Sequence, residues 1–318
     1  MALIGKSDLD VFPLGLGGNT FGWTSDSGTS FAVLDRYVAG GGNFIDTADS
    51  YSAWAAGNEG GESETIIGEW TKARGNRDSV IIATKVSRHP KFRGLSAKII
   101  AAGADESLRR LRTDYIDLYY AHYDDPQVPV AEAAGAFRAL QVAGKIRHVG
   151  LSNYSVPRLR EWISVAEAEG WPSPAAFQPH YNLVEREPYE SEFAPVVAEF
   201  GLGVLPYYAL ASGFLAGKYR TVTENTGTAR QPGAARYLTQ TGLAVLTAMD
   251  KISAERGVEL VTIALAWLLT RPGIVAPLAS ARVAGQLDAL LACATLELTA
   301  GEVKSLDVAS QSASFTQA

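Results

Sequence analysis

Short apolar runs alternate with amphipathic segments along most of this 318-residue chain. The β-branched run at residues 79–85 and the apolar runs at 115–122 and 146–151 have the length and composition of buried strands. Residues 96–111 and 130–143 lie between these runs and carry apolar side chains at helical spacing. The pattern therefore predicts strands and helices in regular alternation.

The alternation extends in both directions and gives eight predicted strands, each followed by a predicted helix. The predicted strands span residues 11–18, 43–46, 79–85, 115–122, 146–151, 175–178, 203–206 and 274–277. The predicted helices span residues 29–39, 63–72, 96–111, 130–143, 156–169, 190–200, 241–256, 260–270, 283–291 and 301–308. A strand–helix repeat of this length is typical of a TIM barrel.

We therefore expect an α/β fold, a (βα)8 TIM barrel with a short N-terminal hairpin at residues 3–10 and accessory helices. No glycine- or proline-rich linker divides the chain, so residues 1–318 are expected to form a single domain. The main alternative is a doubly wound open sheet, which requires a G-x-G-x-x-G loop near the N-terminus. Residues 15–20 match that motif only in part, because Thr20 stands where the last glycine belongs. The barrel is the preferred interpretation.

The composition is that of a globular protein, with 47% hydrophobic and 19% charged residues. The net charge of −6 disfavours general binding to nucleic acid or to anionic membranes. Because Cys293 is the single cysteine, an intramolecular disulfide and a cysteine-based metal site are excluded, and no metal centre is expected. The N-terminus lacks the pattern of a signal peptide, and the longest apolar run, residues 261–269, is too short to span a bilayer. We expect a cytoplasmic protein.

Polar side chains of complementary chemistry stand where three consecutive predicted strands end. Asp46 ends the second strand, Lys85 the third and His122 the fourth, and Tyr51 follows in the loop after the second. Reactive groups of a TIM barrel come from these strand ends, so we expect the four side chains to meet at one rim. Lys85 is expected to lower the pKa of Tyr51, while Asp46 compensates the charge of Lys85. With His122 bonded to a substrate oxygen, the group can protonate an oxygen that gains negative charge.

Each of these four residues also has a purely structural interpretation. Taken singly, the aspartate could cap a helix or a turn, the tyrosine could pack, the lysine could be solvated at a strand end, and the histidine could be hydrogen-bonded at the rim. Four complementary residue types at successive strand ends favour a functional site over that interpretation. We expect the remaining histidines to be structural: His89, His148 and His180.

The sequence resembles the aldo-keto reductase family along nearly its whole length. The matching segments are residues 43–51 (NFIDTADSY), 83–85 (ATK), 114–122 (DYIDLYYAH), 144–153 (GKIRHVGLSN), 178–182 (QPHYN) and 215–219 (LAGKY). The spacing in the first segment, together with Gly-Leu-Ser-Asn in the fourth, is highly specific for that family. The resemblance gives the catalytic roles to four residues, called the tetrad below: Asp46, Tyr51, Lys85 and His122. Tyr51 is then the proton donor.

The resemblance also implies NADP(H) as the cofactor, bound across the barrel mouth. Ser152, Asn153 and Gln178 offer a hydroxyl and two amides to the nicotinamide carboxamide, and the Tyr207 ring is expected to stack on the nicotinamide. Arg282 is expected to bind the adenosine 2′-phosphate, which favours NADP(H) over NAD(H). The full set of expected cofactor contacts is Gly18, Asn19, Asp46, Ser152, Asn153, Gln178, Tyr207, Leu210, Ser212, Gly213, Leu215, Lys218, Arg230, Ser280, Arg282 and Gln286.

Two departures from the family pattern affect the expected cofactor site. Leu290 stands where the family usually has an asparagine, which removes one hydrogen bond to the adenine. Tyr208 and Ala209 replace the usual Ser-Pro after the seventh strand. These departures leave the preference for NADP(H) open, as does the alternative that Arg282 is a solvated residue at the start of a helix.

A polar segment at residues 218–239 is long for a loop in a compact barrel, and we predict a mobile flap over the pyrophosphate with Arg230 as a contact. The substrate is expected between the nicotinamide and the tetrad, in a pocket with aromatic walls. Such walls suit uncharged aldehydes and ketones, and the sequence gives no evident arginine that would hold a substrate carboxylate. The expected pocket residues are Asn19, Phe21, Trp54, Tyr123 and Tyr208.

The sequence thus predicts an NADPH-dependent reductase of aldehydes and ketones, in which hydride passes from the nicotinamide to the carbonyl carbon and Tyr51 protonates the oxygen. Two alternatives stay open. One is a regulatory barrel that binds NADP(H), turns over little and acts through a partner. The other is a lyase or isomerase with Lys85 as a Schiff base, which requires a desolvated lysine. The physiological substrate, the preferred direction and the oligomeric state do not follow from the sequence.

Overall fold

The structure is a computed structural model that describes residues 1–221 and 231–311. At its centre lies a sheet of parallel strands in the order β11-β10-β9-β8-β5-β4-β3-β12, so strands that follow one another in sequence pair in space. This order is the one expected when the same strand–helix unit repeats in one direction. The strands are β3 (Gly15–Gly17), β4 (Phe44–Asp46), β5 (Ile81–Val86), β8 (Ile116–Ala121), β9 (Ile146–Ser152), β10 (Ala176–Gln178), β11 (Gly203–Val204) and β12 (Leu278–Ala279).

The sheet closes on itself between β11 and the segment that leads into β12. Val204 forms a parallel bridge with Ile274, and its carbonyl accepts a hydrogen bond from the backbone N–H of Val275 at 2.9 Å. Three residues after Val275, the N–H of Leu278 donates to the carbonyl of Pro206 at 2.9 Å. The closed ring of parallel strands is the predicted (βα)8 barrel.

The eighth strand differs from its predicted bounds. The sequence predicted residues 274–277, whereas regular pairing with β3 occurs directly after them, at Leu278–Ala279. Pro277 lacks a backbone N–H and therefore interrupts the ladder, so the residues before it contribute only the bridge at Ile274.

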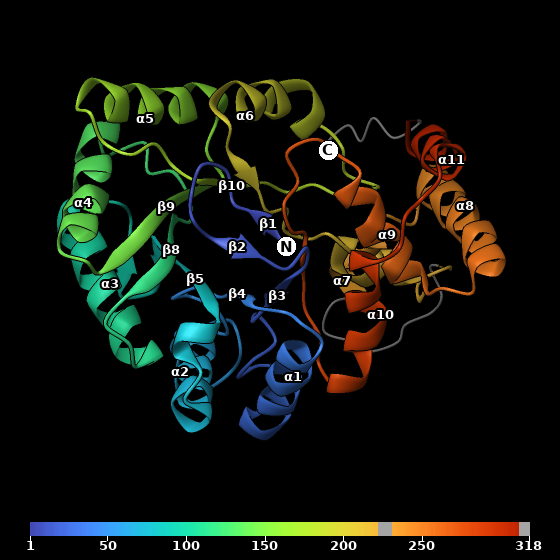
Figure 1. Cartoon of the computed structure of the whole chain (residues 1–318), viewed down its shortest axis with the longest axis horizontal. Coiled ribbons are helices and arrows are strands. Elements are labelled where there is room, and N and C mark those ends of the chain that lie inside the picture. The colour runs from blue at the N-terminus through green and yellow to red at the C-terminus, as the bar shows by residue number, and fades with distance from the viewer. Residues whose placement is uncertain (222–230, 312–318) are drawn as a thin grey trace.

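Helices surround the strands on the outside of the ring, as Figure 1 shows. Most of them lie within two or three residues of their predicted bounds. The helices are α1 (Ser27–Ala39), α2 (Glu62–Arg74), α3 (Ala97–Leu111), α4 (Val130–Val142), α5 (Val156–Ala168), α6 (Ala194–Phe200), α7 (Gln231–Ala235), α8 (Gln240–Arg256), α9 (Leu260–Leu269), α10 (Leu287–Leu291) and α11 (Ala300–Gln311).

The differences at the helix ends have local causes. Helix α1 begins two residues earlier than predicted because the side chain of Asp26 accepts a hydrogen bond from the N–H of Thr29 and so caps the first turn. The predicted helix at residues 190–200 begins with a π-helical segment, Tyr189–Phe193, before α6. The predicted helix at residues 283–291 consists of a 3₁₀ turn, Ala284–Gln286, followed by α10.

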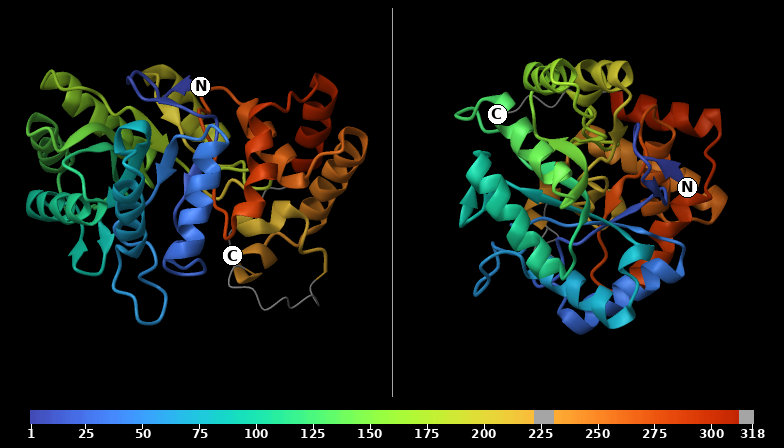
Figure 2. Two further views of the ribbon diagram at one scale, coloured as in Figure 1. Left: turned by 60° about the horizontal axis from the view of Figure 1, so that its bottom comes forward. Right: turned by 60° about the vertical axis from the view of Figure 1, so that its left-hand side comes forward.

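The predicted N-terminal hairpin is present and closes the end of the barrel at which the strands begin. Strand β1 (Ala2–Leu3) pairs with β2 (Asp10–Val11) in antiparallel register. The turn between them packs so closely that a Cβ on Gly5 would come within 2.4 Å of the carbonyl oxygen of Ala175, just before β10. Figure 2 shows the loop between β4 and α2 projecting from the opposite side of the molecule.

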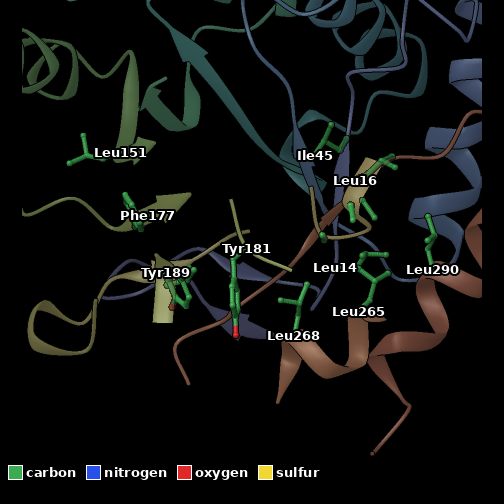
Figure 3. Packing of buried hydrophobic residues seen from close by; sticks show 14 of the residues in the cluster. Leu14, Leu16, Ile45, Leu151, Phe177, Tyr181, Tyr189, Leu265, Leu268 and Leu290 are labelled. Carbon is green, nitrogen blue, oxygen red and sulfur yellow. The ribbon is translucent and has the colours of Figure 1, made fainter. Parts of the chain in front are cut away.

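Apolar side chains fill the barrel and also separate it from the helices. One buried cluster includes Phe44, Leu118 and Leu205 and contains no helical residue, which locates it inside the barrel. A second cluster, part of which is drawn in Figure 3, includes Ile45 and Leu151 and extends to the helices. Neighbouring residues of a strand point to opposite faces, so Phe44 and Ile45 belong to different clusters. Because the interior is filled, polar side chains have room only at the strand ends.

Two parts of the chain have secondary structure that the sequence did not predict. A two-stranded hairpin, β6 (Arg88–His89) with β7 (Phe92–Arg93), follows directly after β5. In the polar segment at residues 218–239, the sequence predicted only loop, but helix α7 occupies part of it. Residues 222–230, and with them the expected contact Arg230, lie outside the described residues.

Two features of the described ranges concern a membrane and a metal ion. None of the helices there is long and apolar enough to cross a membrane. Within residues 1–221 and 231–311, no three His, Cys, Asp or Glu side chains are grouped so that they could hold a metal ion.

Candidate active site

The tetrad comes together at the ends of three neighbouring strands. Asp46 is the last residue of β4, Lys85 is the penultimate residue of β5, and His122 directly follows β8. Tyr51 lies on the loop after β4, where its hydroxyl reaches Lys85. Strands β4, β5 and β8 pair in this order, which brings all four side chains to one rim as the sequence predicted.

The ammonium of Lys85 is fully enclosed by three acceptors. Its Nζ donates to Asp46 Oδ2 at 2.6 Å, to the carbonyl oxygen of Thr47 at 2.7 Å and to the Tyr51 hydroxyl at 3.2 Å. The side chain of Lys85 is 0% exposed and that of Asp46 is 2% exposed. Burial lowers the pKa of Lys85, while the Asp46 carboxylate acts in the opposite direction and stabilises the charge. All three N–H donors are engaged, which counts against Lys85 as a Schiff-base nucleophile.

The acid strength of Tyr51 differs from the sequence-based expectation. We expected Lys85 to lower the pKa of this phenol, but burial and the nearby Asp46 carboxylate together raise its pKa well above the usual value. The phenol also donates weakly to Asp46 Oδ2 at 3.4 Å. Tyr51 therefore keeps its proton at neutral pH.

His122 is a neutral imidazole that faces the phenol. Burial, Lys85 and Arg88 hold the pKa of His122 well below its usual value. The His122 and Tyr51 rings lie edge to face with centroids 6.3 Å apart. The Nδ1 atom is shielded from solvent and has no hydrogen-bond partner in the described part of the chain. A buried polar atom without a partner is unusual and marks a place where a ligand atom would fit.

A network of polar side chains extends from the tetrad along the ends of β9 and β10. The amide of Gln178 donates to Asp46 Oδ1 at 2.9 Å, and Ser152 Oγ donates to the Gln178 carbonyl at 2.9 Å. Asn153 donates to the carbonyl of His122 at 2.9 Å and accepts from the Tyr207 hydroxyl at 2.8 Å. The expected carboxamide-binding residues are thus joined to the tetrad, and Gln178 also helps to orient its carboxylate.

Tyr207 has one face already covered. Its ring stacks on the imidazole of His180, with centroids 5.4 Å apart and an interplanar angle of 18°. His180, which we expected to be merely structural, therefore supports the ring that was predicted to stack on the nicotinamide.

The residues expected around the adenosine phosphate lie on the loops after β3 and β12. Ser280 Oγ donates to Asn19 Oδ1 at 2.7 Å, which joins the two loops. The Gln286 side chain accepts from the backbone N–H of Arg282 at 2.8 Å. The Arg282 guanidinium is exposed, and within residues 1–221 and 231–311 it has neither an ion-pair nor a hydrogen-bond partner. Leu290, at the position of the usual asparagine, is 4% exposed and packs into the core (Figure 3).

The backbone approaches its neighbours closely after β3. A Cβ on Gly18 would come within 2.7 Å of Ser63 Oγ, and one on Gly17 would come within 2.6 Å of Ser280 Oγ. These glycines keep the first loop flat against the rim.

The loop after β11 has an unusual backbone conformation. Tyr208, Ala211 and Ser212 adopt positive φ angles of 52°, 49° and 57°, and Gly213 follows at 93°. Non-glycine residues in this region store strain, and such residues cluster at ligand sites. Among the other expected phosphate contacts, Leu215 is buried, Leu210 is half-buried and Lys218 is exposed.

Four of the five expected pocket residues retain accessible surface. Trp54 is 52% exposed, Tyr208 is 52% exposed and Tyr123 is 37% exposed, and Asn19 is half-buried. Phe21 is 0% exposed, and its carbonyl accepts a hydrogen bond from Ser52 Oγ. Phe21 therefore belongs to the buried core in this structure and offers no accessible surface to a substrate.

The sequence analysis missed several residues around this site. The Trp23 ring packs edge to face on Trp54, with centroids 5.5 Å apart, and Trp54 in turn meets Tyr51 at 6.1 Å. Trp23 lies only two residues after Phe21, a predicted pocket residue, so its aromatic side chain in the same loop was the signal that could have identified it. Arg88, which lowers the pKa of His122, gave no signal because it lies on the unpredicted hairpin after β5.

A buried charged cluster also lies behind the tetrad. Glu64 accepts from Thr84 Oγ1 at 2.5 Å and from Arg110 Nε at 2.6 Å, and it is 0% exposed. Asp49 is equally buried, and neither of its carboxylate oxygens has a partner among the described residues. Burial and Glu64 raise the pKa of Asp49 well above its usual value.

Comparison with known proteins agrees with this geometry. A family model described as "Aldo/keto reductase family" matches residues 13–311. The chain belongs to the aldo/keto reductase family. It is 34% identical over 299 residues to the aldo-keto reductase YhdN of Bacillus subtilis (strain 168), an alignment that covers 90% of this chain and 86% of the relative.

Two further relatives of this aldo/keto reductase carry different descriptions. The norsolorinic acid reductase stcV of Emericella nidulans is 32% identical over 316 residues, which cover 93% of this chain and 78% of the relative. A probable voltage-gated potassium channel subunit beta of Oryza sativa subsp. japonica is 33% identical over 298 residues, with 89% and 88% covered. The family and its reductases make the chain an oxidoreductase of the carbonyl-reducing class.

Proposed function

We propose that this protein reduces aldehydes and ketones to alcohols with NADPH and that Tyr51 donates a proton to the substrate oxygen. One observation carries the proposal: the Tyr51 hydroxyl, the Lys85 ammonium and the Asp46 carboxylate form a single hydrogen-bonded chain at the barrel mouth. Such a chain suits an acid that must release its proton only when an oxygen beside it becomes negative.

The proton moves from the Tyr51 hydroxyl to the carbonyl oxygen as negative charge builds on that oxygen. The resting phenol is protonated, because burial and Asp46 raise its pKa. The phenolate left behind lies 3.2 Å from the Lys85 ammonium, which stabilises its charge. Asp46, 2.6 Å from that ammonium, keeps the lysine charged in its buried position.

His122 orients the carbonyl oxygen. As a neutral imidazole it donates one hydrogen bond and brings no positive charge that would compete with Tyr51 for the proton. The phenol and the imidazole face each other, so both reach an oxygen placed between them.

The residues at the mouth fit a nicotinamide nucleotide. The exposed Arg282 guanidinium, which has no partner among the described residues, suits the adenosine 2′-phosphate, and Ser152 and Asn153 suit the carboxamide. Gly17 and Gly18 allow the first loop to pack directly on Ser280 and Ser63, next to the expected cofactor residues Asn19 and Ser280. When bound, the nicotinamide supplies the hydride that reduces the carbonyl carbon.

The test is the Tyr51→Phe variant assayed with NADPH and a panel of aromatic aldehydes. We expect the rate of NADPH oxidation to fall by about 10²–10⁴-fold, the usual contribution of general acid catalysis, while NADPH binding is retained. Tyr115→Phe is the matched control, because Tyr115 precedes β8 at the opposite end of the barrel and bonds Asp78. Equal rates in Tyr51→Phe and wild type would refute the proton-donor assignment.

A second candidate function follows from one of the relatives. The similarity to a probable channel β subunit favours a barrel that binds the cofactor and acts through a partner protein. The hydrogen-bonded chain of Tyr51, Lys85 and Asp46 favours turnover, since cofactor sensing alone does not need Tyr51 beside Lys85. Tight NADPH binding with negligible turnover over a wide carbonyl panel would favour the regulatory function instead.

A further inference from the structure

The β6–β7 hairpin lies beside the mouth of the candidate active site. It begins directly after β5 at Ser87, a non-glycine residue with a φ of 113°, and such strained residues cluster at ligand sites. Ser87 Oγ accepts a hydrogen bond from the N–H of Tyr123 at 3.1 Å, which fixes the hairpin to the residue after His122. The hairpin is therefore attached to the rim at the tetrad.

The two faces of this hairpin differ in chemistry. His89 and Phe92 are opposite each other with ring centroids 5.2 Å apart, and His89 is 3% exposed, so this face is turned inward. Arg88 and Arg93 are also direct cross-strand partners, and both are exposed on the outer face. Like charges placed opposite one another on a two-stranded sheet destabilise it. The hairpin thus keeps two guanidiniums together at a cost in stability.

Arg88 also lacks the carboxylate partner that most arginines of the described chain possess. The ion pairs of Arg74, Arg158 and Arg256 are typical examples of that rule. Neither Arg88 nor Arg93 forms an ion pair within residues 1–221 and 231–311. An accessible guanidinium kept without a partner on a chain of net charge −6 is available for an anionic ligand.

The position of Arg88 relates it to the substrate rather than to the cofactor phosphates. Its guanidinium lies over the Tyr123 ring, with Cζ 4.4 Å from the ring centroid. The Tyr123 ring packs in turn on the His122 ring, with centroids 5.2 Å apart. One aromatic ring therefore separates Arg88 from the imidazole that bonds the carbonyl oxygen. The expected 2′-phosphate residue, Arg282, follows β12, four strands away from β8 in the sheet.

We propose that Arg88 is a specificity-determining residue that binds the carboxylate of an anionic aldehyde or ketone whose carbonyl lies between Tyr51 and His122. The inference rests on the proposed reductase function and gives it a substrate class, the oxo acids with a flat spacer of about one ring between carbonyl and carboxylate. The fork of the guanidinium matches a carboxylate in two parallel hydrogen bonds. The Tyr123 ring beneath the guanidinium orients that fork, and the positive charge of Arg93 adds to the attraction for an anion.

The test compares two aldehydes of the same shape and different charge, 4-formylbenzoate and its methyl ester. With the wild-type protein and NADPH, kcat/KM for the anion is expected to exceed that for the ester about tenfold or more, through a lower KM. In Arg88→Gln this preference disappears because only the anion loses affinity. Arg88→Lys restores part of it, since the charge returns without the fork. High salt reduces the preference of the wild type and leaves Arg88→Gln unchanged.

Arg138→Gln serves as the matched control for the loss of one positive charge. Arg138 lies on α4 outside the barrel and is also without an ion pair in the described ranges. We expect its substitution to leave the ratio of the two kcat/KM values unchanged. A wild-type protein without preference for the anion, or an Arg88→Gln variant that loses both substrates equally, overturns the assignment of Arg88.

A binding measurement tests the role of Arg88 independently of the proposed reductase activity. The dissociation constants of both aldehydes are measured by calorimetry in the presence of NADP⁺, which requires no turnover. If neither these aldehydes nor the wider carbonyl panel is reduced, the reductase proposal fails, and the binding constants still decide the role of Arg88. Selective loss of 4-formylbenzoate binding in Arg88→Gln supports that role, and equal binding of both aldehydes to wild type and variant overturns it.

Discussion

The Nζ atom of Lys85 lies 2.6 Å from Oδ2 of Asp46, and both side chains are almost completely withdrawn from solvent. Withdrawing two charges from water costs several kcal/mol per ion, and good geometry with further hydrogen bonds must offset that cost. Here Thr47 and Tyr51 complete the shell of the ammonium, and Gln178 bonds the second oxygen of the carboxylate. Each of the two charges is therefore compensated only while the other is present.

Replacing one residue of the Asp46–Lys85 pair should therefore lower the free energy of unfolding more than replacing both. We expect Asp46→Asn to lower the free energy of unfolding by about 3–5 kcal/mol, because the Lys85 ammonium is left buried without a counter-charge. The double variant Asp46→Leu/Lys85→Met should be more stable than Asp46→Asn, although inactive. Urea denaturation curves of the three proteins measure this order, and a double variant less stable than the single one would contradict it.

Stability should fall in mild acid through His122. Its pKa in the folded protein is well below the value near 6.5 that the unfolded chain has, so the unfolded state binds the proton more readily. The contribution of His122 is complete above about pH 6.5, and below it falls by up to about 1.4 kcal/mol per pH unit. Denaturant unfolding between pH 7.5 and 5 should show a steeper loss in wild type than in His122→Gln.

His180 also contributes to the loss of stability in acid, and its effect has to be separated from that of His122. Burial and Arg236 lower the pKa of His180 to about 4, so protonation of His180 also destabilises the folded state in acid. The quantity to measure is therefore the difference between wild type and His122→Gln at each pH. A constant difference across this range would contradict the assigned pKa direction of His122.

The parts of the site that the sequence predicted are those that local patterns determine. Apolar periodicity locates β4, β5 and β8, and the residue types at their ends identify Asp46, Lys85 and His122. Parallel strands that follow one another pair with their neighbours, so the strand ends had to meet. No contact between distant residues was needed for that inference.

The parts that the sequence missed depend on contacts between distant residues or on very short elements. The raised pKa of Tyr51 results from burial and from Asp46, and periodicity gives no measure of burial at a loop. Phe21 is covered by a loop that Ser52 anchors, more than thirty residues away. The hairpin strand that carries Arg88 has two residues, too few to show an alternation.

Cofactor preference should depend on Arg282. Its guanidinium is exposed and unpaired within the described ranges, so Arg282→Gln should not disturb the fold. If it binds the adenosine 2′-phosphate, the dissociation constant for NADPH should rise about 10- to 100-fold, because a charge-assisted pair is lost. The constant for NADH, which has no such phosphate, should stay the same. Fluorescence titration measures both, and an equal loss for the two cofactors would exclude this role.

Phe21 and Trp54 should respond to truncation in opposite ways. Phe21 is 0% exposed, so Phe21→Ala should lower the free energy of unfolding by about 3–5 kcal/mol, as is usual for a large cavity in a core. Trp54 is 52% exposed and contacts Tyr51, so Trp54→Ala should change stability little and raise KM for aromatic aldehydes several-fold. Denaturation curves together with steady-state kinetics distinguish the two. If Phe21→Ala is as stable as the wild type but has altered substrate selectivity, Phe21 lines the substrate pocket after all.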